Sequence, residues 1–316
     1  KNSKMFITGP EVVKTVTGEE VGQEDLEDLY PLPRSGVADF PAENDADCLE
    51  QIRYLLSFLP SNNRENPPVY DTGDSAYRMD ESLNTIILTG PDAYDMYKVI
   101  RSIVDNGEYV EPHRMYARNI ITCLARMDGS TVGIIANQPR IMAGCLDINA
   151  SDSGPFIRFC DAFRIPLINI VDVPGFLPGT DQEYGGIIRH GAKMLYANCE
   201  ATVPKITLVT GRLTGALIWP CVPRIWVRIT SLLAHGGNRV MGPQGAAKII
   251  FRKDPDVEQK TQEYITNFAH ADYAASTMVE MVIEPKTTRP ILIKALRMLK
   301  SKQEDRPTKK HGNIPL

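Results

Sequence analysis

The sequence has few of the features that mark disulfide-bonded, zinc-binding, secreted or membrane-spanning proteins. Its six cysteines form no CxxC pair, so neither a disulfide framework nor a structural zinc site is indicated. No apolar run approaches the ~20 residues of a membrane span, and no signal peptide is recognisable. We therefore expect a cytoplasmic protein whose thiols are reduced and mostly buried.

Initiator methionine, excess charge and familiar catalytic motifs are also missing. The chain starts Lys1-Asn2-Ser3, so we expect it to be a piece of a longer protein. A net charge of -4 over 316 residues gives no reason to expect nucleic acid or an anionic membrane as a partner. There is no P-loop, HExxH or DFG motif and no zinc-ligand spacing, so no metal site is predicted.

One long stretch lacks acidic residues altogether. Asp and Glu account for 39 of the 316 residues, yet none occurs between Ala201 and Lys253. Both tryptophans, Trp219 and Trp226, fall in this stretch. Its composition therefore differs from that of the rest of the chain.

The clearest structural pattern that is present covers Pro166 to Ala197. Pro166 to Val173 is rich in Val and Ile, which is typical of a strand buried on both faces, and Asp172 is the one charge at its end. A Pro- and Gly-rich loop follows, and then a helix that Thr180 or Asp181 can cap. Open α/β folds bind ligands at such junctions, because helix-start amides point at the ligand. An ordinary tight turn is the alternative.

Several residues of this stretch are candidates for a site. Phe176 and Leu177 lie between two prolines, where a solvated loop has little reason to carry an apolar pair. Gly185 and Gly186 open the helix, so their amides could hold a ligand oxygen, although close packing explains these glycines equally well. His190 has no partner at a triad spacing, and a structural hydrogen bond explains it better than catalysis.

The rest of the chain alternates strands and helices, which predicts an α/β domain with much of its sheet covered. Asp128-Gly129 predicts a hairpin turn, and Asp147 and Asn149 are better explained as helix caps than as site residues. Helices are predicted at 44–60, 95–105, 154–163, 246–251, 257–268 and 289–301, and strands at 119–126, 131–136, 166–173 and 204–210. The polar, Pro-rich stretch 61–80 predicts a linker, and the basic tail 302–316 predicts a solvated extension.

Several segments together resemble one known family. They are FITGPEVVKTVTGEEV, SGVADFPAENDAD, TVGIIANQP, GCLDINASD, IRFCDAF, VDVPGFLPGTDQEYGGIIRHGAKMLYA, EATVPK and KKHGNIPL. They are similar to the β-type carboxyltransferase subunits of biotin-dependent acyl-CoA carboxylases and decarboxylases. This family includes propionyl-CoA carboxylase β chains, methylmalonyl-CoA decarboxylase α chains and transcarboxylase large subunits. The resemblance covers most of the chain.

The resemblance implies an α/β, crotonase-type fold in two similar domains, one for acyl-CoA and one for carboxybiotin on a carrier protein. Residues 1–60 would end the N-terminal domain, 61–94 would be a linker, and 95–316 would be the C-terminal, biotin-binding domain. The implied reaction transfers a carboxyl group between carboxybiotin and a short-chain acyl-CoA, propionyl-CoA or methylmalonyl-CoA, through enolates held by backbone amides. No general base is required.

The resemblance also implies partners and site residues. The partners are a biotin carboxyl carrier protein or domain, biotin carboxylase or membrane decarboxylase subunits, and further copies of the chain, with a hexamer in the full-length family. Membrane association would then come through partner subunits. Carried onto this sequence, the biotin pocket comprises Gly175, Phe176, Leu177, Gly185 and Gly186, and a backbone oxyanion hole comprises Gly215, Ala216 and Leu217.

The sequence departs from the family in two places. Where the family has RKAYGG, a helix and AWPxAEIAVM, this chain reads GRLTGALIWPCVPRIWVRITSLLAHGGNRVM. If possible codons for Gly211 to Trp226 are read with the frame shifted by one base, they encode RKAYGGAYMAMCSKDL. In the same way, Glu27 to Arg34 can result from a one-base deletion in codons for GGAYTHSR. We therefore interpret 27–34 and 211–239 as frameshifted segments, with an evolved alternative packing as the other interpretation. Sequencing the gene distinguishes them, because an intact frame through 211–239 excludes the frameshift.

Two other functions remain open. A non-catalytic fragment would bind the carrier or partner subunits without turnover. A crotonase-type hydratase would need a pair of catalytic Glu residues on the site face, and the sequence shows none.

Overall fold

The structure is a computed structural model that describes residues 7–22, 35–88, 93–214, 229–233, 237–239, 250–251, 256–268 and 280–315. Within these ranges the chain forms a mixed α/β fold. The helices are α1 (Pro10–Thr17), α3 (Asp45–Leu56), α4 (Ser82–Leu88), α5 (Met96–Ile103), α6 (Ile148–Ser151), α7 (Gly154–Ala162), α8 (Thr180–Gly185), α9 (Ile187–Glu200), α12 (Val257–Phe268) and α14 (Thr288–Leu299). Short 3-10 turns lie at Asp105–Gly107, Met142–Gly144 and Pro285–Thr287. The strands are β1 (Tyr109–Val110), β2 (Ile120–Met127), β3 (Ser130–Asn137), β4 (Leu167–Val173), β5 (Lys205–Thr214), β6 (Ile229–Leu233), β7 (Gly237–Arg239) and β8 (Met281–Ile283).

The strands form one sheet in the order β1-β2-β3-β4-β5-β6-β8, and β7 pairs with the end of β5. The strands β1, β2 and β3 are antiparallel, whereas β3, β4, β5, β6 and β8 run parallel. The β2–β3 connection turns at Asp128 and Gly129, both at positive φ, as the predicted hairpin requires. The carboxyl ends of β3, β4 and β5 therefore share one edge of the sheet.

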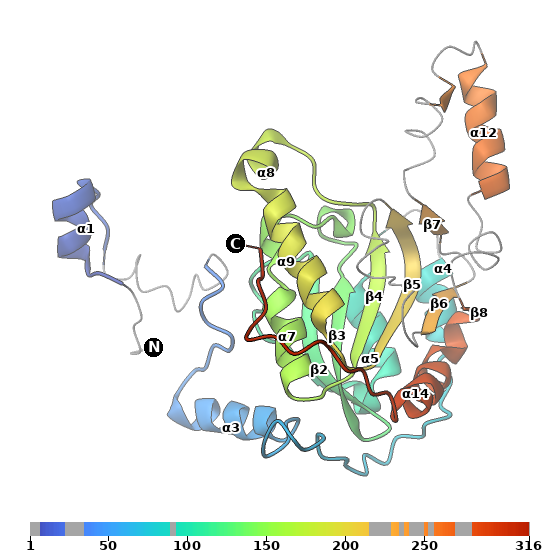
Figure 1. Ribbon diagram of the computed structural model, residues 1–316, viewed down its shortest axis with the longest axis horizontal. Coiled ribbons are helices and arrows are strands. Elements are labelled where there is room, and N and C mark those ends of the chain that lie inside the picture. Colours follow the sequence, from blue (N-terminus) through green and yellow to red (C-terminus); the bar gives the residue numbers. More distant parts are fainter. Residues whose placement is uncertain are drawn as a thin grey trace.

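Helices cover both faces of the sheet, with α7 and α9 on one side and α5 and α14 on the other (Figure 1). Every residue of β4 is buried. Alternate β4 side chains divide between the two layers: Leu167 and Val171 join the α7–α9 core, and Ile168 and Ile170 join the α5–α14 core. The prediction of a covered α/β sheet is confirmed, and its cause is the apolar character of both faces of the central strand.

The predicted helices at 44–60, 95–105, 154–163, 257–268 and 289–301 are all present with slightly different bounds. Asn44 caps α3, with its side chain accepting from the Asp47 amide at 3.0 Å. The apolar stripe of α3 is not covered, however, since Leu49 and Leu56 are more than half exposed. Only 250–251 of the helix predicted at 246–251 lies within the described residues.

Two segments expected to be loosely attached make specific hydrogen bonds to the rest of the fold. Within the predicted linker, Val69 bridges to Ser130, and Arg78 donates to the carbonyls of Ser102 and Val104. In the tail, Lys302 donates to the carbonyls of Thr202 and Val203 with its side chain almost fully buried. Most of the tail is exposed, in agreement with the predicted solvated extension, but Lys302 is an exception, because its ammonium satisfies free carbonyls beyond the end of α9. The domain boundaries at 60 and 94 stay a prediction.

A buried ion pair connects the hairpin turn with α14, at the edge of the sheet where the parallel strands begin. The Arg289 guanidinium, on α14, lies 2.7 Å from Asp105 Oδ1 and donates to the Ile103 carbonyl. The Asp105 carboxylate also accepts from the amides of Asp128 and Gly129. One carboxylate thus connects the hairpin turn with the last helix of the fold.

Candidate functional site

The loop after β4 lies at the carboxyl edge of the sheet and is attached to the segment that follows β3. The Leu146 amide donates to the Gly175 carbonyl at 3.1 Å, and the Leu177 amide donates to the Leu146 carbonyl at 2.8 Å. Leu146 and Phe176 form a parallel bridge between these two hydrogen bonds. The loop is therefore held like a short added strand, and is not a free turn.

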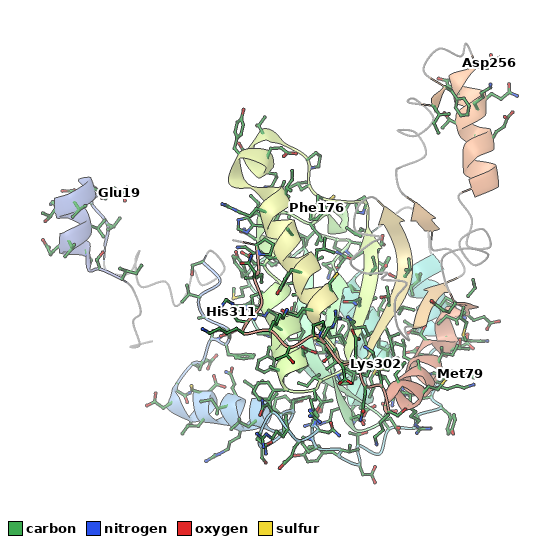
Figure 2. The ribbon with its side chains drawn as sticks, viewed as in Figure 1. Glu19, Met79, Phe176, Asp256, Lys302 and His311 are labelled. Atoms are coloured by element: carbon green, nitrogen blue, oxygen red, sulfur yellow. The ribbon has the colours of Figure 1, made fainter. Side chains whose placement is uncertain are left out.

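Phe176 packs on α9. A Cβ atom on Gly191 would lie 2.7 Å from Cζ of the Phe176 ring, so the glycine leaves room for the ring. Figure 2 shows Phe176 beside the first turns of α9. Phe176 and Leu177 are both half-buried. The Phe176 ring therefore anchors the loop, and this apolar pair is less exposed than the sequence predicted.

The amides of Gly175 and Phe176 are the donors that the loop presents. In a parallel bridge, hydrogen bonds from the neighbouring strand go to the flanking residues, so the N–H of Phe176 points away from Leu146. Within the described part of the chain, neither the Gly175 nor the Phe176 amide has a backbone acceptor. Gly175 has φ +145, and a Cβ there would meet nothing within 4 Å, so its surface is open. These two N–H groups can donate hydrogen bonds to a ligand oxygen.

Gly185 and Gly186 serve packing and a chain reversal. A Cβ on Gly185 would overlap the Ile148 side chain, and Gly186, at φ +86, separates α8 from α9. The Gly186 amide already donates to Glu183 at 3.1 Å. Of the two explanations for this pair, close packing is the one that the contacts support.

The helix predicted after the loop is divided in two, and its cap was predicted wrongly. The N-cap of α8 is Gly179, whose φ of +144 suits glycine, and no side chain caps that end. Thr180 and Asp181 instead occupy the first turn, where the carboxylate of Asp181 complements the helix dipole. Ile187 is buried in α9, whereas Ile188 is exposed.

The segment 144–152 contacts both parts of the candidate site, the loop 174–179 and the helix α8. Leu146 holds the loop, and the Ile148 amide donates to Gln182 Oε1 of α8 at 3.0 Å. Asp147 caps α6 by accepting from the Ala150 amide at 2.8 Å, as predicted. Asn149 lies in the first turn of α6 and does not cap it. Loop and helix are thereby placed side by side by residues far from them in sequence.

Asp172 and Gly211 meet between β4 and β5. The Asp172 carboxylate occupies the space that a Gly211 side chain would need, and Asp172 is almost fully buried. The hydroxyl of Thr210, next to Gly211, donates to the Val171 carbonyl. The same hydroxyl oxygen lies 2.6 Å from the Tyr94 hydroxyl, in a hydrogen bond that either group can donate. The end of β5 is thus packed tightly against the end of β4. The predicted oxyanion-hole residues that follow, Gly215 to Leu217, lie outside the described residues.

His190 makes the structural hydrogen bond that the sequence favoured. Its Nδ1 lies 3.3 Å from Asp152 Oδ1, and Lys193 Nζ lies 3.9 Å from the same oxygen.

Among the described residues, no group of three His, Cys, Asp or Glu side chains could hold a metal ion. Over the same residues, none of the helices has the length and apolarity needed to cross a membrane.

Four residues important to this geometry were not predicted: Leu146, Ile148, Gly191 and Gly211. Leu146 and Ile148 belong to the motif GCLDINASD, which the family resemblance singled out only as a match. Gly191 and Gly211 carry no local signal beyond glycine inside a helix and a strand, which indicates close approach without naming the neighbour.

Comparison with known proteins identifies the family. Residues 1–314 match the Carboxyl transferase domain family, and the chain belongs to this family. It is 59% identical to methylmalonyl-CoA decarboxylase subunit alpha of Veillonella parvula, over 99% of this chain and 63% of that protein. It is 45% identical to the propionyl-CoA carboxylase beta chain of Roseobacter denitrificans, over 100% of this chain and 64% of that protein.

A solved structure agrees with the fold. The chain matches transcarboxylase 12S, crystallised with methylmalonyl-coenzyme A and methylmalonic acid and described as a hexamer, with a TM-score of 0.95 and 45% identity. The match covers 99% of this chain and 62% of that chain. The chain thus spans less than two thirds of the length of each of these three proteins. The predicted family and the α/β class are both confirmed.

Proposed function

We propose that this chain forms the biotin-binding part of an acyl-CoA carboxyltransferase, which moves a carboxyl group between carboxybiotin and a short-chain acyl-CoA. The observation that carries the proposal is the loop 174–179, fixed by Leu146 at the carboxyl edge of the sheet, where the amides of Gly175 and Phe176 have no backbone acceptor among the described residues. Fixed amides stabilise an oxygen that gains negative charge during reaction, because they need no reorganisation.

The residues present suit biotin as the group that the family implies. An open glycine surface with two N–H donors that have no backbone acceptor in the described ranges, next to half-buried apolar side chains, matches a small apolar ring that carries a polar oxygen. Bound carboxybiotin would supply the carboxyl group. In this proposal Gly175 and Phe176 donate to its oxygen, Leu177 contacts its apolar part, and Gly185 lets α8 approach Ile148 of α6. Gly215, Ala216 and Leu217 would add a second set of amides.

The relatives support a particular substrate class and a particular assembly. Two of them are named for methylmalonyl-CoA and propionyl-CoA, and the transcarboxylase 12S structure is described as a hexamer and a multienzyme core. We therefore propose propionyl-CoA or methylmalonyl-CoA as substrate and a homo-oligomer as the working assembly. The proposal includes a crotonase-type fold, a biotin carboxyl carrier partner, and biotin carboxylase or decarboxylase partner subunits. The cytoplasmic location stays a prediction.

A non-catalytic fragment that only binds the carrier or partner subunits is the second candidate. The observation that favours it is the acid-free stretch Ala201–Lys253, where the family pattern is lost next to the proposed oxyanion hole. In that case the loop 174–179 would be formed normally, while the second amide set would be absent.

A hybrid subunit tests both candidates. Residues 1–316 replace the matching part of the Veillonella parvula decarboxylase subunit, and free-biotin-dependent decarboxylation of methylmalonyl-CoA is measured. A second hybrid is identical except that 211–239 carries the Veillonella sequence, and the unaltered subunit is the reference. Circular dichroism and the oligomeric state establish that each hybrid is folded.

The outcomes separate the two functions. Activity in the first hybrid supports the carboxyltransferase if it is abolished by Gly175→Pro, which removes one of the two loop amides and, because proline cannot adopt the φ of +145, also displaces the loop. Activity in the second hybrid alone supports the non-catalytic fragment and assigns the defect to 211–239. Two folded but inactive hybrids overturn the proposed role of the loop.

A further inference from the structure

The turn that follows β3 has a strained backbone. Met142 has φ +48 and Ala143 has φ +53, and Gly144 continues this left-handed run at φ +78. Over the described part of the chain, Met142 and Ala143 are the only two consecutive non-glycine residues at positive φ. In this region the Cβ atom of an L-residue comes too close to the following carbonyl oxygen, which costs about tenfold in population for each residue. Such strain persists only where the surrounding structure enforces it.

The strained turn leads directly to the residue that holds the candidate site. The Cys145 amide closes the turn by donating to the Met142 carbonyl at 2.9 Å. Leu146 comes next, and its amide and carbonyl make the two hydrogen bonds that hold the loop 174–179. The direction in which the chain leaves the turn therefore sets where this loop lies.

Two buried asparagines hold the end of the turn. Asn137, the last residue of β3, donates its side-chain amide to the Gly144 carbonyl at 3.2 Å. Asn119, directly before β2, donates to the Cys145 carbonyl at 2.8 Å and to Asp147 Oδ1 at 3.0 Å. Asn119 is 1% exposed and Asn137 is 7% exposed. Hydrogen bonds in so buried a place face little competition from water, and they can therefore enforce a strained backbone.

The strand β4 also holds this turn. A Cβ atom on Gly144 would overlap the carbonyl oxygen of Asp172, so the backbone of the turn lies directly against the end of β4. Asp172 is almost fully buried, and the chain runs from it through Val173 and Pro174 into the loop. Residues at the adjacent ends of β2, β3 and β4 thus fix one short turn beside the candidate site.

We propose that Asn119 and Asn137 are positioning residues for the candidate site. They hold the turn 142–144 in its left-handed conformation, and the held turn places Leu146 against the loop 174–179. The inference rests on the proposed function, because this loop is where we place the carboxybiotin oxygen. The two asparagines act through Leu146 and do not touch the ligand. A loop that is fixed before the ligand binds needs no reorganisation during the reaction.

Replacement of Ala143 by glycine tests the strain. In the 316-residue chain, Ala143→Gly should raise the folded-to-unfolded ratio about threefold in urea unfolding, because glycine avoids the tenfold cost but loses about threefold in chain entropy on folding. Arg164→Gly, at an exposed residue with φ +56 before β4, is the matched control and should give a similar gain. A lower ratio in Ala143→Gly, the ordinary result of glycine at an unstrained position, would overturn the proposal.

Hydrogen exchange of the same chain tests the positioning. The Leu146 and Leu177 amides report on the loop, because each makes one of the two hydrogen bonds that hold it. Asn119→Ala and Asn137→Ala should each speed the exchange of these amides at least tenfold, while the Gly133 amide, hydrogen-bonded in the first half of β3, keeps its rate. No acceleration at Leu146 and Leu177, or an equal acceleration at Gly133, would overturn the proposal.

A control and a rescue sharpen this measurement. Thr131→Val removes a buried hydrogen bond to the Phe58 carbonyl and should leave the exchange of the Leu177 amide unchanged. In Asn137→Ala combined with Ala143→Gly, the left-handed turn no longer carries strain at residue 143, so the Leu177 amide should return to within about threefold of its original rate. A double variant that exchanges as fast as Asn137→Ala would overturn the proposal. The Ala143→Gly result decides the strain even if an asparagine variant does not fold.

The unfolding and exchange measurements need no substrate, so they separate this inference from the proposed function. Two inactive hybrids, together with the expected exchange pattern, would refute the carboxyltransferase and support the positioning role. In an active hybrid, Asn137→Ala should lower free-biotin-dependent decarboxylation at least tenfold, and Ala143→Gly should restore most of it. An active hybrid in which Asn137→Ala changes neither the activity nor the exchange of the Leu177 amide would overturn the positioning role alone.

Discussion

The ring of Phe176 lies against Gly191, fifteen positions further along the chain, with only 2.7 Å between Cζ and the site of a Cβ atom. This contact, together with the two hydrogen bonds to Leu146, fixes the loop after β4. The proposed biotin amides therefore depend on a glycine in the middle of a helix. That dependence can be tested directly.

Gly191→Ala is expected to destabilise the fold by about 1–2 kcal/mol, because overpacking at the ring outweighs the gain in helix propensity. In α7, a Cβ on Gly154 would lie 3.4 Å from its nearest neighbour, an ordinary contact. Gly154→Ala is thus the control and should change stability by about 0.5 kcal/mol or less. Urea unfolding measures both. Adding Phe176→Leu should recover part of the loss in Gly191→Ala, and a simple sum of the two single effects would contradict direct contact.

Gly129 in the hairpin turn and Gly73 in the stretch 61–80 form a matched pair of glycines with nearly equal φ angles. Gly129 has φ +73 and Gly73 has φ +69, but a Cβ on Gly129 would overlap the Tyr70 carbonyl, whereas one on Gly73 meets nothing within 4 Å. Gly73→Ala should cost about 1 kcal/mol from the left-handed backbone alone. Gly129→Ala should cost at least about 2 kcal/mol, because the overlap adds to this strain. Equal losses in thermal or urea unfolding would show that the Tyr70 contact is unimportant.

The Arg289–Asp105 pair should be far more important to stability than a similar pair on the same helix. Both of its side chains are 1% exposed, whereas the side chains of Arg297 and Asp128, also 2.7 Å apart, are 53% and 36% exposed. Arg289→Met leaves a buried carboxylate unpaired and should cost about 3–5 kcal/mol. Arg297→Met, the control, should cost about 1 kcal/mol or less. If Arg289→Met does not fold, Asp105→Asn with Arg289→Met should recover part of the loss, and no recovery would argue against pairing as the cause.

Lys205 should make stability rise with pH in the alkaline range. Burial, more than the nearby charge of Lys302, lowers the pKa of the Lys205 ammonium to about 8. In the unfolded chain the ordinary lysine pKa is about 10.4. Between these values the unfolded chain binds more protons than the folded chain, so the free energy of unfolding gains a positive slope with pH from this group.

Lys205→Met should remove that slope between about pH 8 and pH 10.4 in urea unfolding. It should also lower stability at pH 7, because the ammonium donates to the carbonyls of Asn198 and Ala201, each at 2.7 Å. Lys286→Met, at an exposed lysine, is the control and should keep the slope. A slope that persists in Lys205→Met would assign it to another group.

Local patterns accounted for much of the fold. The apolar run Pro166–Val173 predicted the fully buried strand β4, and Asp128-Gly129 predicted the β2–β3 hairpin, because burial and turn geometry are set by neighbouring residues. The four apolar residues of the helix predicted at 95–105 are all buried in α5 for the same reason. The family was also predictable, because its motifs are continuous segments of sequence. The match of residues 1–314 to the family confirms that prediction.

What the sequence could not supply are the contacts between distant segments. It pointed to Gly185 and Gly186 as possible donors, but the Gly186 amide is occupied and Ile148 fills the space beside Gly185. It treated the stretch 61–80 and the tail as loosely attached, although Arg78 and Lys302 bind main-chain carbonyls that only the fold brings to them.

The sequence by itself therefore determined the α/β class and the family, and it predicted the loop 174–179 as the place for a ligand. Only the tertiary structure decided where Phe176 is seated and which amides of that loop have no backbone acceptor among the described residues. The reason is physical. Strand and turn preferences act between neighbours in sequence, whereas hydrogen-bond satisfaction and close packing act between neighbours in space.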